Sequence, residues 1–151
     1  MGKKELEQRQ VDNYGRADES AEKAVKAKNK ALRALERVKS QDHIKNKKGP
    51  AIGVVKHAKV AKKEAVKAAD CAKDAKEVTK IARNVADATK DQKDEEFAED
   101  IEDMGDSTET AANDAKEAAD EAAKAADEAK AHAEMTPKEV AAAEKLAEEA
   151  D

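Results

Sequence analysis

The chain has 151 residues, of which 30 are basic and 35 acidic, so 43% of it is charged and the formal net charge is −5. Alanine supplies 35 of its 59 apolar residues, and there is one Phe, one Tyr and no Trp. So few bulky side chains cannot fill a β-sandwich or a doubly wound α/β core to native density, and five Gly and two Pro are too few for an all-β chain. This composition excludes most enzyme folds and favours long helices, because Ala, Lys and Glu are strong helix formers.

The first predicted helix covers residues 4–46, where small and apolar residues recur at alternating steps of three and four. This spacing is a heptad pattern, and we expect it to face a partner helix. Lys28 occupies one inward position, where its stem can lie along the helix while its ammonium group reaches water. The inward positions are Tyr14, Ala17, Ala21, Ala24, Lys28, Ala31, Leu35 and Val38.

Residues 46–53 carry two Gly and a Pro, and we predict a loop there. The second predicted helix, 52–104, contains an unbroken seam of about five heptads, which predicts a left-handed supercoil with a partner helix. The seam consists of Val54, Ala58, Ala61, Ala65, Ala68, Ala72, Ala75, Thr79, Ala82, Ala86 and Thr89.

A second break is predicted at 105–108, with Ser107 or Thr108 as the N-cap of a helix over 107–134. Its seam runs Ala112, Ala115, Ala119, Ala122, Ala126, Ala129 and Ala133, beside a second column of Ala111, Ala118 and Ala125. Residues 136–139 form a capping box with Pro137 at the first helical position, which predicts a short fourth helix over 137–150.

These elements predict an all-α fold: one elongated antiparallel three-helix bundle over 1–151 with alanine-rich heptad seams, plus the short C-terminal helix after Pro137. Residues 1–90 carry a net charge of +11 and residues 91–151 a net charge of −16. We therefore expect the acidic third helix to pack against the basic first two, although exposed ion pairs contribute only about 0–1 kcal/mol each.

No pattern in the sequence indicates catalytic, cofactor-binding or metal-binding residues, and we expect a protein that is not an enzyme. The acidic segment 91–106 could hold a divalent cation, but a calcium loop that starts at Asp100 would place Met104 and Ala111 at ligand positions. We interpret the segment as a charged, flared or kinked end of the second helix.

The remaining candidate groups are isolated. His43, His57 and His132 are too far apart in sequence for a metal-binding motif and are expected at the surface. Cys71 is expected to be a small residue beside the seam, and a reactive thiol or an intermolecular disulfide is the alternative. The lack of interleaved aromatic residues argues against nucleic-acid binding and against a small-molecule pocket. Gly2 is a weak match to a myristoylation site because Leu6 replaces the expected Ser or Thr.

Two stretches carry a resemblance, Ala58-Lys-Val-Ala-Lys-Lys-Glu-Ala-Val-Lys-Ala68 and Ala115-Lys-Glu-Ala-Ala-Asp-Glu-Ala122. Their register resembles the alanine heptads of parasite surface antigens, and of the glutamate/alanine-rich and bloodstream alanine-rich coat proteins of trypanosomes in particular. The resemblance implies an extended helical bundle that carpets the cell surface on a lipid (GPI) anchor. It transfers no functional residues, and it implies a trimmed chain, since no leader or anchor signal is found in this sequence.

The sequence thus favours a structural coat antigen that shields a parasite cell membrane and packs against copies of itself or neighbouring coat proteins. The membrane would be reached only through an anchor outside this chain. A second hypothesis is a stress-protective protein of the late-embryogenesis-abundant type, whose repeats the stretch Asp114-Ala-Lys-Glu-Ala-Ala-Asp-Glu-Ala-Ala-Lys124 is similar to. A third is an intracellular coiled-coil adaptor, for which the expected location is cytoplasmic.

Overall fold

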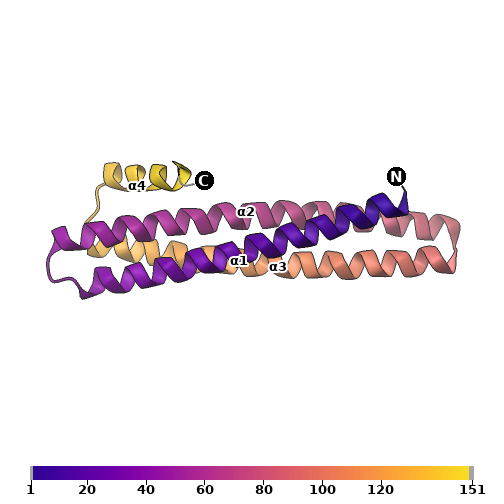
Figure 1. Cartoon of the computed structure of the whole chain (residues 1–151), viewed down its shortest axis with the longest axis horizontal. Coiled ribbons are helices and arrows are strands. Elements are labelled where there is room, and N and C mark those ends of the chain that lie inside the picture. Colours follow the sequence, from indigo (N-terminus) through magenta and orange to yellow (C-terminus); the bar gives the residue numbers. More distant parts are fainter. Residues whose placement is uncertain (1, 150–151) are drawn as a thin grey trace. The chain divides into compact units, whose positions relative to one another are not determined.

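A computed structural model describes residues 2–149 of the chain as four helices (Figure 1): α1 (Lys3–Ser40), α2 (Ile44–Thr89), α3 (Gln92–His132) and α4 (Pro137–Glu149). No strand occurs within residues 2–149, so the prediction of an all-α fold is confirmed. The long helices follow from a chain in which strong helix formers dominate and apolar residues recur at heptad spacing.

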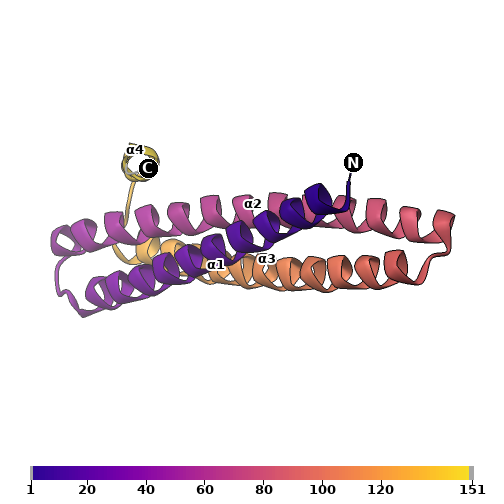
Figure 2. The same cartoon turned by 45° about the vertical axis from the view of Figure 1, so that its right-hand side comes forward.

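The helices build two compact units, and each contains segments of α1, α2 and α3. The first unit comprises Met1–Ala21 and Val66–Asp114, and the second comprises Glu22–Ala65 and Ala115–Asp151. Figure 2 shows the turn from α2 to α3, which belongs to the first unit, and the turn from α1 to α2, which belongs to the second. The helical segments of each unit pack as a bundle around a core of their own.

The core of the second unit consists mainly of alanine methyl groups. Thirteen of the seventeen residues in this buried cluster are alanine, and the others are Leu35, Val38, Val54 and Val55. Ion pairs join α1 to α3 along its edge, from Lys28 to Glu121 at 3.3 Å and from Lys39 to Glu128 at 2.7 Å. As expected for its seam position, the stem of Lys28 is mostly buried while its ammonium group reaches a carboxylate.

The core of the first unit contains larger side chains. Leu6, Val78 and Ile101 are buried together with three alanines, and Ile81, Phe97 and Met104 pack against them. Arg83 of α2 binds Glu102 of α3 at 2.6 Å, and Lys76, further from the turn, lies 3.9 Å from Glu109. The acidic third helix therefore does pair with basic residues of α1 in the second unit and of α2 in the first.

The alanine seams point inward as predicted. Ala61, Ala68 and Ala75 of α2 are all 0% exposed, whereas Ala65 and Ala72 are half-buried. All ten alanines predicted for the seams of the third helix are buried, the last of them, Ala133, just after the end of α3. Two seam positions are wrong: Tyr14 is 41% exposed, because the buried position beside it belongs to Asn13, and Thr89 is exposed at the last residue of α2.

The predicted loop at 46–53 is wrong, because these residues lie inside α2. Pro50 removes only one backbone donor, while Ala51, Val54 and Val55 bury their side chains in the core of the second unit. Burial thus outweighs the poor helix propensity of this stretch. The connection lies at 41–43 instead, where His43 Nδ1 accepts a hydrogen bond of 3.2 Å from the backbone N–H of Lys45 and so caps α2.

The second predicted break, at 105–108, is also wrong, and so are the helix bounds 52–104 and 107–134 and the end of the predicted helix 4–46, because α1 ends at Ser40. The hydroxyl groups of Thr108 and Thr110 donate to the carbonyl groups four residues earlier in the same helix. Both residues therefore lie inside α3, and Thr108 does not cap the start of a helix. The chain turns instead at Lys90, which has a left-handed φ of 55°. Asp91 Oδ1 then accepts a bond of 2.8 Å from the N–H of Lys93 and caps the start of α3. The acidic segment 91–106 therefore starts α3, and its interpretation as a flared or kinked end of the second helix is wrong.

The capping box at 136–139 is confirmed. The N–H of Glu139 donates to Thr136 Oγ1 at 3.2 Å, and the N–H of Thr136 donates to Glu139 Oε1 at 3.1 Å. Helix α4 begins at Pro137 and buries Ala143 and Ala147, while Lys48 of α2 holds Glu139 at 3.2 Å. The expected helix end at 150 lies outside the described residues.

Candidate functional site

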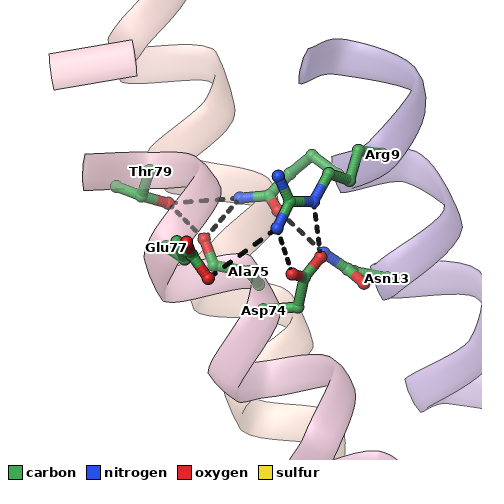
Figure 3. Close-up of polar contacts among 7 residues, drawn as sticks. Arg9, Asn13, Asp74, Ala75, Glu77 and Thr79 are labelled. Atoms are coloured by element: carbon green, nitrogen blue, oxygen red, sulfur yellow. Dashed lines mark hydrogen bonds and ion pairs between the residues drawn. The ribbon is translucent and has the colours of Figure 1, made fainter. Parts of the chain in front are cut away.

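The most distinctive group of side chains is a polar cluster in the first unit, formed by the buried Gln10 and Asn13 and the partly exposed Arg9 of α1 with Asp74 and Thr79 of α2. Figure 3 shows Arg9, Asn13, Asp74 and Thr79 of this cluster. Gln10 and Asn13 continue the heptad seam of α1 toward the N-terminus, because Leu6, Gln10, Asn13 and Ala17 follow one another at steps of four, three and four. Polar side chains therefore occupy inward positions that alanine fills elsewhere. Such positions require hydrogen-bond partners, since an unpaired buried polar group is costly.

Gln10 lies at the centre of the cluster and is 0% exposed. Its amide Nε2 carries two N–H groups, which are shared among three acceptors: the carbonyl of Ala75 at 3.2 Å, Thr79 Oγ1 at 3.1 Å and the carbonyl of Ile101 at 2.9 Å. The amide oxygen lies 3.5 Å from Asn13 Nδ2. One side chain of α1 thus contacts both α2 and α3, and the Thr79 hydroxyl, unlike the backbone carbonyls, is offered at only one heptad of the α2 seam.

Asp74 forms the half-exposed edge of the cluster. Its carboxylate accepts two hydrogen bonds from the Arg9 guanidinium, one of them from Nε at 2.9 Å, and a third from Asn13 Nδ2 at 2.8 Å. The hydrogen bond to Arg9 is the main reason why the pKa of the Asp74 carboxyl is lowered, and the same bond raises the pKa of Arg9. The pair therefore stays ionised at neutral pH, and a carboxylate stabilised in this way is a poor proton acceptor there.

Gly105 of α3 makes room for this cluster. A Cβ atom at this position would lie 2.9 Å from Thr79 Oγ1 and 3.1 Å from Gln10 Nε2, closer than ordinary van der Waals contact. The residue that we interpreted as a helix breaker thus allows a close approach between α3 and the polar side chains.

The residues singled out in the sequence do not join this site. His43 caps α2, and the His57 imidazole is half-buried in the second unit. Partial burial raises the pKa of the Cys71 thiol, which lies on α2 of the first unit. The acidic segment 91–106 forms the first turns of α3, and no three His, Cys, Asp or Glu side chains within residues 2–149 gather where they could hold a metal ion.

Gln10 and Asn13 escape prediction because the predicted seam of the first helix starts at Tyr14, and Asp74 escapes it because it lies on α2 outside the predicted seam. The steps of four, three and four from Leu6 to Ala17 continue the heptad spacing toward the N-terminus. They do so only if the polar side chains of Gln10 and Asn13 point inward.

None of the helices described for residues 2–149 combines the length and the apolar character needed to cross a bilayer. No family model, curated protein or solved structure matches this chain at a significant level.

Proposed function

We propose that this chain is a constitutively folded, non-enzymatic structural protein, and that it acts as a coat antigen whose helical bundle shields a cell membrane. The observation that carries the proposal is the buried side chain of Gln10, which bonds to α2 and α3 simultaneously. A polar residue at an inward seam position is a known means of fixing register. In a chain that becomes helical only on drying, three separate helical segments are not held in one alignment in solution, and we would not expect such a contact.

The finer architecture that we propose is a single elongated, antiparallel three-helix bundle. The ion pairs inside each unit support it. In the first unit Arg83 pairs with Glu102 and Lys76 with Glu109, so the residue numbers of the partners rise on α3 while they fall on α2. In the second unit the partners on α1 and α3 advance together. Both orders are those of an up-down-up arrangement with short connections.

The coat role follows from the small inward residues and the charged outer faces. Alanine seams allow helix axes to approach to about 8 Å, so a bundle built from them is thin and many copies fit on a given area. In this proposal the partners are copies of the chain or neighbouring coat proteins, the location is the cell surface, and a lipid anchor provides the attachment.

Circular dichroism in dilute buffer tests the constitutive fold. We expect a strongly helical spectrum with a cooperative thermal transition, and limited proteolysis should leave a large helical core. A disordered spectrum that becomes helical on drying would overturn the proposal in favour of the late-embryogenesis-abundant type. Surface labelling of the producing cell with an antibody then tests the location, since an intracellular adaptor would be labelled only after permeabilisation.

A further inference from the structure

The second unit carries a basic groove between α1 and α2, with a cavity volume of about 550 Å³. Cations from α1 form one side of it, and small or neutral residues of α2 form the other. The lining includes Lys30, Arg33, Arg37, Gly49, Gly53 and His57. Because Gly49 and Gly53 have no side chains, the floor of the groove is open to a convex partner.

The cations of this groove lack carboxylate partners. Lys30, Arg33 and Arg37 are exposed, and none of them forms an ion pair with any residue in the described range 2–149. Lys26 continues the row, so that cations follow one another at steps of four, three and four on one face of α1. This row spans about 16 Å at a rise of 1.5 Å per residue.

His57 of α2 lines the groove and is half-buried. Partial burial is the main reason why the pKa of its imidazole is lowered, and the other causes are the cations Lys30, Lys56 and Arg33. Burial and the neighbouring cations thus both disfavour a further positive charge at this place.

The first unit carries a matching row of acidic residues on α3. These side chains are exposed, and none of them is ion-paired within the part of the chain that the structure describes. They are Glu96, Glu99, Asp100, Asp103 and Asp106. The row lies on one side of α3, with Glu99 and Asp100 adjacent and the other steps three residues long, and it spans about 15 Å, close to the length of the basic row.

We propose that the basic groove binds the acidic row of α3 from a second copy of this chain. The two rows carry opposite charges and have similar lengths, and both belong to the same protein, so copies can meet without another component. The contact joins different surfaces of the two copies, so it can repeat from copy to copy and build an array. This inference rests on the proposed structural function, because it requires bundles that are folded before they meet.

Light scattering during gel filtration, at about 20 mM and about 500 mM NaCl, tests the contact, because salt screens exposed charges. We expect the average mass at low salt to be at least about twice the monomer mass, and monomers at high salt. The variant R33E/R37E reverses the groove, and E99K/D103K reverses the acidic row. Each variant alone should remain monomeric at low salt, and a 1:1 mixture of the two should associate again, because opposite charges then face each other.

The matched control is K73E/K80E, which changes the net charge as much as R33E/R37E does but lies on exposed positions of α2 in the first unit. It should associate like the wild type. A wild-type chain that is helical but monomeric at low salt would overturn this inference and leave the proposed function standing, whereas a chain without helix would remove both. Association that survives R33E/R37E, or that K73E/K80E also abolishes, would overturn the inference as well.

Vesicles containing phosphatidylserine and a single-stranded RNA oligonucleotide serve as competing anionic partners. Co-sedimentation with vesicles or a gel shift with RNA that R33E/R37E removes, without any self-association of the wild type, would assign the groove to that partner and overturn the proposal. Self-association that neither probe displaces would support it.

Discussion

The second unit is closed by alanine methyl groups, whereas the first unit buries Gln10 and Asn13 beside larger residues such as Leu6 and Ile101. Alanine methyls allow close packing, but they do not distinguish one heptad from the next, since a slide of one helix by seven residues again places alanine on alanine. The Thr79 hydroxyl that Gln10 meets, and the space that Gly105 leaves beside both, occur together at only one heptad. Close helix packing and the axial register of the helices therefore depend on different parts of this chain.

The largest effect is expected from Gln10→Ala in the first unit. The variant removes the hydrogen bonds to the Ala75 carbonyl, Thr79 and the Ile101 carbonyl and leaves a cavity, so the free energy of unfolding should fall by about 2–4 kcal/mol. Urea denaturation followed by circular dichroism measures the loss. The control is Gln8→Ala, at an exposed position of the same helix, which should change the free energy by less than about 0.5 kcal/mol. Equal losses would remove the distinction between the two units.

The alanine core of the second unit can be broken by adding volume. Ala129 is fully buried in α3, and Ala129→Leu forces the helices apart, so the free energy of unfolding should fall by about 1–3 kcal/mol. Ala131→Leu places the same side chain on an exposed position two residues later and should cost less than about 0.5 kcal/mol. If Ala129→Leu stabilised the protein, the core would be loosely packed and the closeness of its helices would not depend on alanine.

Two glycines of the first unit should respond in opposite directions. Gly105→Ala brings a Cβ atom to 2.9 Å from Thr79 Oγ1 and 3.1 Å from Gln10 Nε2, so we expect a net loss of about 1 kcal/mol in the free energy of unfolding. A Cβ atom at Gly15 would meet nothing within 4 Å. Gly15→Ala should therefore gain about 0.5–1 kcal/mol from helix propensity. Thermal melts of both variants check the direction of each change. A gain in stability from both variants would mean that the polar cluster has room for the added methyl group.

Gly105 also illustrates which parts of the fold could be predicted from the sequence. The fold class, the inward faces of α2 and α3 and the capping box at 136–139 follow from local periodicity and chemistry, and all were predicted. The turns at 41–43 and 90–91 were not, because a helix interior can retain Pro50 and Gly105 when tertiary packing compensates. A left-handed Lys90 gives no compositional signal, although Asp91 followed by Asp94 and Glu95 is a readable helix start.

The candidate site was less predictable than the fold. Gln10 and Asn13 could have been placed inward from spacing alone, but their partners come from positions more than sixty residues away in sequence. Which carbonyl groups a buried amide meets depends on the axial alignment of three helices, and the uniform alanine seams leave that alignment open. The polar cluster therefore supplies the information that the seam pattern lacks.

The smallest effect is the pH dependence at the edge of the polar cluster. Because the pKa of Asp74 is lowered in the folded protein, its ion pair with Arg9 contributes stability above the unfolded-state pKa of about 3.9, and this contribution is lost as the pH falls through the folded pKa. Asp74→Asn should reduce the free energy of unfolding by at most about 1 kcal/mol at neutral pH, since the pair is partly exposed. The difference between wild type and variant should shrink below pH of about 4, as measured by urea denaturation across the range. A loss that is unchanged at acidic pH would mean that Asp74 acts as a neutral hydrogen-bond acceptor for Asn13, and that the first unit fixes its register without charge.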